Sequence, residues 1–300
     1  MAVNTKTIKR RIRSVSNTRK ITKAMEMISA VKMRRAVSNV LATRGYASFA
    51  WEMLTEIAEK TDVNLHPLLS KRDIKKVGVI LITSNRGLAG GFSSRLLQEV
   101  HNFVTKKTGE KAEVEIILSG RQGRKIHYKF GHKVAAEFDK YDLTTKIDEI
   151  MPIAQLATKE YIEGKYDLVV VAYTDFASAL RQIPRLKQIL PLENKADEML
   201  GGTTSDKKLE VSVARLGYKF EPNPRAVLDI LLPRLVEMQV YQAVLESDAS
   251  EHSARMMAMR NASDSAKEII KELNYSYNKA RQSAITQEIS EIVGGAAALE

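Results

Sequence analysis

Apolar and small residues in the last quarter of the chain recur with alternating spacings of three and four. No glycine or proline occurs between Arg234 and Val293. A period of 3.5 residues held for about eight heptads is typical of a supercoiled helix, and at 1.5 Å per residue this helix would be roughly 90–100 Å long. We expect it to project and to be held by another protein. The positions of the repeat are Leu228, Leu231, Leu235, Met238, Gln242, Leu245, Ala249, His252, Met256, Met259, Ser263, Ala266, Ile270, Leu273, Tyr277, Ala280 and Ala284.

A second long helix is expected at the start of the chain, because residues 1–44 contain no glycine or proline. Asn4 or Thr5 is suited to cap it. Its apolar face begins regularly and then shifts, which predicts a stutter in a coiled coil. Gly45 interrupts the pattern, and residues 46–60 continue a helix. The apolar face comprises Ile8, Ile12 and Val15, then Ile21, Met25 and Ile28, and later Val40 and Leu41.

The middle of the chain has a different pattern, with short apolar runs separated by helical segments. All seven prolines lie between positions 67 and 233, and twelve of the fifteen glycines lie between 78 and 217. Strands separated by helices of this length favour a mostly parallel sheet in an α/β, Rossmann-like domain. The expected strands are 77–83, 114–118, 134–138, 167–173, 183–190 and 209–216, and the expected helices are 93–107, 121–130 and 147–163.

The predicted architecture is therefore an α/β domain inserted between two long helices that pair as a coiled coil. Antiparallel pairing is the simpler arrangement, although periodicity does not fix the direction. We divide the chain into an N-terminal helix and extension (1–66), the inserted domain (67–224) and a C-terminal helix and tip (225–300). The N-terminal helix is too short to pair with all of the C-terminal one. The apolar end beyond Ala284 therefore indicates a partner that encloses it.

The formal charge of +11 is concentrated at one end of the chain. Residues 1–40 hold eleven lysine or arginine residues and one acid, Glu26, which amounts to +10. Such a patch fits an arm that binds nucleic acid, a solvated helix face, or a track that faces an acidic protein. Composition does not separate these three interpretations.

One stretch has the position of a phosphate-binding loop. Ser84–Phe92 (SNRGLAGGF) follows an expected strand and precedes an expected helix. It lacks the Gly-Lys-Ser/Thr ending of a P-loop and does not match Gly-x-Gly-x-x-Gly. The glycines favour a sharp, projecting turn with Arg86 as an exposed contact residue, and a nucleotide-binding enzyme is the minor alternative.

No other residues form a constellation with obvious chemistry. The five histidines form no His-x-x-x-His or Glu-x-x-His pair, and there is no cysteine, so we expect no metal site, disulfide or cofactor. His252 lies in the helical repeat and is expected to be a core residue. No apolar run reaches the length of a membrane span, and the first residues are not a signal peptide. The residues therefore predict a non-enzymatic assembly protein, with a nucleic-acid-binding coiled coil as the competitor.

Four segments resemble the gamma subunits of F-type ATP synthases, and together they span nearly the whole chain. They are Ile21–Met33 (ITKAMEMISAVKM), Ser84–Phe92, Ser253–Arg260 (SARMMAMR) and Tyr277–Leu299 (YNKARQSAITQEISEIVGGAAAL). The resemblance implies a central rotor shaft whose two terminal helices form an antiparallel coiled coil inside a hexamer of alpha and beta subunits. The α/β domain would contact the epsilon subunit and the ring of c subunits. Such a shaft couples proton flow to ATP synthesis, or ATP hydrolysis to ion pumping, without an active site of its own.

The resemblance also implies contact residues, each at a position where a motif matches. The first helix would pass the moving lobe of beta near Met25, and the glycine-rich turn would face the same lobe. A cluster of acids on that lobe would give the basic first residues a protein counterpart, in place of nucleic acid. The implied contact or coupling residues are Lys23, Met25, Glu26, Arg86, Arg255, Arg281, Gln282, Thr286 and Glu288.

The absence of cysteine departs from the chloroplast form, so thiol regulation is not expected. Ala89 stands where some relatives have cysteine, which is not expected to affect coupling. Initiation at Met1 favours a bacterial origin, with peripheral association at the cytoplasmic face of the inner membrane through the complex.

Overall fold

The computed structural model describes residues 5–60, 66–144, 146–192 and 224–297. By contacts the chain forms two compact units, one of Met1–Ser29 with Arg255–Glu300 and one of Ala30–Ala254. The strand expected at 209–216 lies outside the described residues. The division into segments 1–66, 67–224 and 225–300 stays a prediction.

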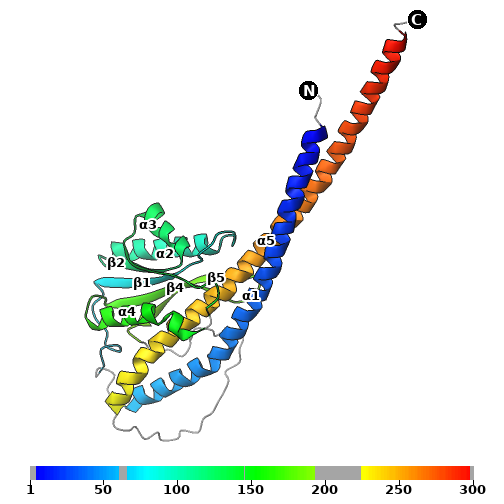
Figure 1. Cartoon of the computed structure of the whole chain (residues 1–300). Helices are drawn as coiled ribbons and strands as arrows, with labels where there is room; N and C mark the ends of the chain where they lie inside the picture. The colour runs from blue at the N-terminus through cyan, green and yellow to red at the C-terminus, as the bar shows by residue number, and fades with distance from the viewer. Residues whose placement is uncertain (1–4, 61–65, 145, 193–223, 298–300) are drawn as a thin grey trace. The chain divides into compact units, whose positions relative to one another are not determined.

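The larger unit contains a five-stranded sheet of order β3-β2-β1-β4-β5 (Figure 1). Strands β1 to β4 are parallel, and β5 is antiparallel to β4, so the predicted mostly parallel sheet is confirmed. Strands β1, β2 and β4, at the centre of the sheet, are mostly apolar, as expected where helices cover both faces of a parallel sheet. The strands are β1 (Lys76–Ile82), β2 (Glu113–Ser119), β3 (Val134–Phe138), β4 (Leu168–Phe176) and β5 (Gln182–Leu190).

Two hydrophobic cores lie on opposite faces of this sheet. On one face, α2 (Phe92–Gly109) and α3 (Lys125–Phe130) pack on the odd-numbered positions of β1 (Val77, Val79 and Leu81). On the other face lie α4 (Met151–Ile162) and the first part of α5 (Pro224–Ala297). Short 3₁₀ turns, Arg121–Arg124 and Ile147–Glu149, precede α3 and α4. The helices predicted at 121–130 and 147–163 therefore form, each with a tighter first turn.

The first long helix, α1, runs without a break over Thr5–Lys60, so Gly45 does not end it. In the larger unit α1 contributes Val40 to the same core as Leu228, Leu232 and Leu235 of α5. Pro233 lies inside α5, nine residues after the helix begins, and the helix continues beyond it to Ala297. None of the helices is long and apolar enough to cross a membrane, as far as the described residues extend.

A glycine is required where β2 ends. Gly120 has φ of 101°, and a Cβ atom there would lie 2.2 Å from the carbonyl oxygen of Thr83. Only glycine adopts this conformation without strain and without the clash. The tight approach brings the end of β2 beside the end of β1, where the glycine-rich turn begins.

Candidate contact surfaces of the long helices

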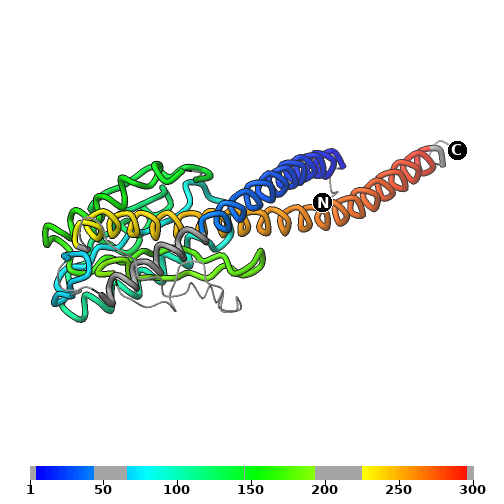
Figure 2. The backbone as a smooth tube through the Cα atoms, turned by 90° about the horizontal axis from the view of Figure 1, so that it is seen from below, coloured from blue at the N-terminus to red at the C-terminus, as the bar shows by residue number. Residues whose placement is uncertain are grey.

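The smaller unit is a pair of helical segments, one from each end of the chain. Figures 1 and 2 show the segment of α1 beside that of α5, with the colour gradients running in opposite directions, so the pairing is antiparallel as expected. We call the buried or half-buried face of each long helix its seam. On α5 the predicted heptad positions form this seam in the smaller unit: Met256, Met259, Ser263, Ala266, Ile270, Leu273, Tyr277 and Ala280.

The seam of α1 differs from the prediction. Ile21, Ile28 and Leu41 are 61%, 56% and 56% exposed, so the expected shift to these residues is wrong. The buried positions are Thr22 and Ser29, which continue the seven-residue spacing of Ile8 and Val15 without a stutter. The pattern of large apolar residues was misleading because small side chains line this seam. Small residues allow two helices to approach closely.

The seam of α5 ends at Ala280, and we call the exposed residues 281–295 the tip. Ala284, predicted to be the last seam position, is exposed, because α1 begins only at Thr5 and gives it no partner among the described residues. The tip carries Ile285, Ile289 and Ile292, which are 47%, 56% and 72% exposed. All of its residues are exposed, and the spacing of Ile285, Ile289 and Ile292 places them on one face, so the tip presents an uncovered apolar stripe.

Four of the predicted contact residues lie on this tip. Arg281, Gln282, Thr286 and Glu288 are all exposed. The Thr286 hydroxyl donates a hydrogen bond to the carbonyl oxygen of Gln282 at 3.0 Å, within the helix. The guanidinium, amide and carboxylate groups therefore face outward, where they are available to a partner.

Three further predicted residues lie on α1 in the same unit. Lys23 Nζ donates to both carboxylate oxygens of Glu26, at 3.1 and 3.0 Å. The Lys23 side chain is 57% exposed and that of Glu26 is 16% exposed, whereas Met25 is half-buried. Arg255, the first α5 residue of this unit, is only 7% exposed. A role for Arg255 in coupling must therefore pass through the residues that it touches.

The glycine-rich turn belongs to the larger unit, and it projects as predicted. Arg86, Gly87 and Leu88 are exposed, and Leu88 is in the left-handed region with φ of 64°. Asn85 anchors the turn to two neighbouring loops. Its side chain donates a hydrogen bond to the carbonyl oxygen of Lys140 and accepts one from the N–H group of Arg121. Arg86 is thus presented on a braced loop.

In parallel α/β sheets, ligands bind outside the carboxyl ends of the strands. In the larger unit this edge is occupied by helix α5. Ala254 packs with Ala89 and Phe92 beside the glycine-rich turn, and Ser253 Oγ donates to the carbonyl oxygen of Ala179 at 2.6 Å. The place where such a fold would hold a nucleotide is therefore filled by the protein's own helix.

The loop after β3, Asp139–Thr144, contacts α5 at the same edge. Lys140 Nζ lies 2.6 Å from Asp248 Oδ1 and 2.8 Å from Glu251 Oε2. The backbone N–H group of Thr144 donates to Asp248 Oδ2 at 2.8 Å. His252 Nε2 lies 2.8 Å from the carbonyl oxygen of Asp142, so His252 is a satisfied core residue.

The pKa values of this cluster follow from its burial. Burial disfavours the charge on Lys140, but Asp248 and Glu251 together outweigh that effect and raise the pKa of Lys140 above its ordinary value. Burial raises the pKa of Asp248, against the lowering effect of Lys140. Burial lowers the pKa of His252, because it disfavours the charged imidazolium, and the nearby Glu251 carboxylate opposes this shift. Lys140 is therefore held in its charged form.

The sequence interpretation missed this cluster. The sequence feature that could have revealed it is a mostly polar run, Glu246–Arg255, on a helix whose preceding turns are apolar. Every residue from Val240 to Ala254 is buried, which a single coiled-coil seam cannot produce. A polar run that is buried all round requires partners on several sides, and only the folded α/β unit supplies them.

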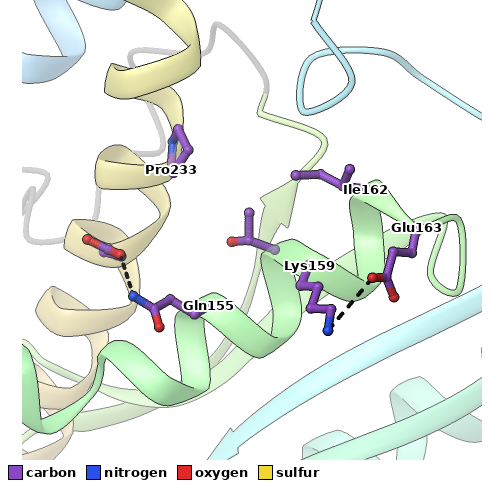
Figure 3. Close-up of a pocket in the computed structure, with 7 residues that line it drawn as sticks. Gln155, Lys159, Ile162, Glu163 and Pro233 are labelled. Carbon is purple, nitrogen blue, oxygen red and sulfur yellow. Dashed lines mark hydrogen bonds and ion pairs between the residues drawn. The ribbon is translucent and has the colours of Figure 1, made fainter.

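Figure 3 shows a pocket of about 270 Å³ between α4 and α5. Gln155 Nε2 lies 3.5 Å from Glu237 Oε1 across it, and Lys159 Nζ lies 3.8 Å from Glu163 Oε1 on its rim. None of the predicted contact residues lines it. No group of three or more metal-binding side chains was found among the described residues. The lining residues are Gln155, Thr158, Lys159, Ile162, Glu163, Pro233 and Glu237.

Comparisons with family models, curated sequences and solved structures all point to the same family. The family model described as ATP synthase matches residues 4–299. The chain is 42% identical to the ATP synthase gamma chain of Chloroflexus aurantiacus over 295 residues, which is 97% of each chain. It is 39% identical to that of Legionella pneumophila, over 98% of this chain and 99% of the relative. Among solved structures, a chain of the Euglena gracilis mitochondrial ATP synthase (OSCP/F1/c-ring) has a TM-score of 0.65 at 18% identity, over 98% of this chain and 94% of that one.

Proposed function

Because the chain belongs to the family of ATP synthase gamma chains, we propose that it is the rotating central shaft of a bacterial F-type ATP synthase. In this role it couples proton flow through the membrane sector to ATP synthesis on the beta subunits. In reverse it couples ATP hydrolysis to proton pumping. It contributes no active site of its own.

The observation that carries the proposal is the exposed tip of α5. Every residue from Arg281 to Gly295 is exposed, and Ile285, Ile289 and Ile292 lie among them. An isolated helix with this much apolar surface is unfavourable in water unless a partner covers it. A sleeve of alternating alpha and beta subunits would cover this apolar face and the exposed polar groups of the tip at the same time.

The exposed polar groups are proposed to make the contacts that carry torque. Arg281 and Gln282, next to Thr286 and Glu288, would hydrogen-bond a loop of beta at the point where the intramolecular seam ends. On α1, Lys23, Met25 and Glu26 would face the moving lobe of beta. Their basic neighbours in the first forty residues would be attracted to acids on that lobe.

The remaining contacts in this proposal involve the larger unit and Arg255, the first α5 residue of the smaller one. Arg86 would reach beta from the braced glycine-rich turn. Arg255 is buried, and it would orient its neighbours rather than contact beta. The α/β domain would bind epsilon and the c-ring, and the chain would thereby associate peripherally with the cytoplasmic face of the inner membrane.

Reconstitution tests this function directly. The chain would be assembled with alpha and beta subunits of the same bacterium, and a probe attached to an exposed residue of α2 would be followed while ATP is hydrolysed. We expect one chain per hexamer and unidirectional rotation of the probe. A chain that stays monomeric, or hydrolysis without rotation, would contradict the proposal. Salt-dependent RNA binding without assembly would favour the nucleic-acid interpretation of the basic segment.

A further inference from the structure

Three connections at the carboxyl edge of the sheet surround about two turns of α5, and we call them the collar. They are the glycine-rich turn Ser84–Gly91, the loop Asp139–Thr144 and the β4–β5 connection Ala177–Arg181. Their contacts with α5 fall on residues 248–254, all within the larger unit. These two turns of the helix are buried on every side.

The contacts are distributed around the helix axis. At about 100° per residue, Ser253 lies roughly 140° and Ala254 roughly 240° around the axis from Asp248. Asp248 faces the loop, Ser253 faces the β4–β5 connection and Ala254 faces the glycine-rich turn. The collar therefore holds α5 from three directions within about 9 Å along its axis, an arrangement that opposes rotation of the helix about that axis.

The contact with the loop is ionic and fully buried. The side chain of Lys140 is 2% exposed, and those of Asp248 and Glu251 are 0% and 4% exposed. Water cannot replace a lost partner at this depth, so a turn of α5 would leave buried charges unpaired, which is strongly unfavourable. Apolar contacts are non-directional and tolerate a small slip. The ion pairs therefore set the angle of the helix more sharply than the apolar core can.

The same loop also contacts α1. Lys32 forms an ion pair with Asp142, and Asn39 Nδ2 donates to the carbonyl oxygen of Thr144 at 3.3 Å. Residues 32 and 39 are two turns apart on one side of α1. One six-residue loop is thus bonded to both long helices and, through β3, to the sheet.

We propose that the collar is the torsional joint of the shaft, in which Lys140, clamped between Asp248 and Glu251, passes torque from the α/β domain to α5. This inference rests on the proposed rotary function. Lys140 is a positioning residue, since it acts through α5 and touches no reacting group. Its loop partners bring α1 under the same constraint, so that both helices turn together with the domain.

The test compares two sets of substitutions in the assembled complex. Lys140→Met with Asp248→Asn and Glu251→Gln removes the buried charges at similar volume. The matched control, Arg124→Met with Glu137→Gln, removes an exposed ion pair of 2.7 Å in the same unit, away from α5. A probe attached at Lys106→Cys, an exposed position on α2, reports the angular fluctuations of the α/β domain while ATP hydrolysis is arrested.

We expect an angular variance at least about twofold larger for the neutral cluster than for the parent, because the directional contacts that set the angle are gone. The control is expected to match the parent. In a separate assay of ATP turnover, both variants are expected to hydrolyse ATP. Equal variance in all three chains would overturn the inference.

A second variant keeps the test decisive should the triple substitution fail to assemble. Glu251→Gln alone retains the Lys140–Asp248 pair, so a smaller increase in variance is expected, and no increase would again overturn the inference. A parent complex that assembles but does not rotate would instead overturn the proposed function. The two failures are therefore distinguishable.

Discussion

Lys140 Nζ lies 2.6 Å from Asp248 Oδ1, and neither side chain is more than 2% exposed. The two residues come from a loop after β3 and from the middle of α5. Removal of Asp248 leaves the buried Lys140 with Glu251 as its only carboxylate partner, which costs far more than the loss of an exposed pair. The pair therefore makes the docking of α5 on the sheet edge sensitive to single substitutions.

Asp248→Ala is expected to lower the free energy of unfolding by about 3–5 kcal/mol, because it leaves Lys140 with a single carboxylate in a buried site. Glu137→Ala is the matched control. It breaks the exposed pair with Arg124 and is expected to cost less than about 1 kcal/mol. Urea unfolding followed by circular dichroism measures both, and equal losses would contradict this role for the pair.

The corrected seam of α1 gives a second prediction. Ile8 is 7% exposed and Ile21 is 61% exposed, although the two are alike in sequence pattern. Ile8→Ala is expected to lower the free energy of unfolding by about 2 kcal/mol or more, through lost burial. Ile21→Ala is expected to change it by less than about 0.5 kcal/mol. Urea unfolding measures both variants. A larger loss of stability for Ile21→Ala than for Ile8→Ala would contradict the corrected seam and favour the predicted stutter.

The seam of α5 could be predicted from the sequence because its heptad positions are mostly apolar. From Met256 to Ala280 every predicted position is buried or half-buried. The seam of α1 was predicted only in part, since Thr22 and Ser29 occupy core positions that are polar in sequence. Polar or small residues at such positions become recognisable only when the partner helix is present.

The collar could not be predicted for a related reason. Asp248 and Glu251 look like solvent-facing residues of a long helix, and Lys140 looks like a loop residue. Their pairing depends on a contact across more than a hundred residues, which local periodicity does not encode. The glycine-rich turn, in contrast, was predicted correctly, because the backbone conformations that glycine allows depend on the local sequence alone.

Arg281→Ala is expected to impair coupling more than folding. The residue is exposed just beyond the seam, so the free energy of unfolding of the isolated chain should change by less than about 0.5 kcal/mol. In the reconstituted complex, ATP-driven proton pumping per ATP hydrolysed should fall. Lys279→Ala, at an exposed residue two positions earlier and on the opposite side of α5, is the control for loss of charge. Poor assembly with normal coupling of the complexes that do form would contradict the role assigned to Arg281.

A histidine pair predicts a pH dependence of stability in the larger unit. His101 Nδ1 lies 2.9 Å from His132 Nε2, and the His101 ring stacks on Phe130 with centroids 4.3 Å apart. Burial, and to a smaller extent His101, lower the pKa of His132 below 6.5. Between the two pKa values the unfolded chain binds more protons than the folded one. This contribution to stability is therefore complete above pH 6.5 and decreases as the pH falls below it.

His132→Gln is expected to flatten that dependence. The measurement is the free energy of unfolding as a function of pH between about 5 and 8, where histidine titrates. His127→Gln, at an exposed neighbouring histidine, serves as the control. A parent chain whose stability rises as the pH falls below 6.5 would contradict the direction of the shift.

The most direct test of the central claim is a single-particle reconstruction of the complex purified through a tag on this chain. The rotary-shaft proposal predicts a single copy of the chain per particle, with Arg281–Gly295 of α5 enclosed by a ring of six subunits and the α/β domain outside that ring. A chain whose tip lies in solvent, or that is present in one copy for each surrounding subunit, would contradict it.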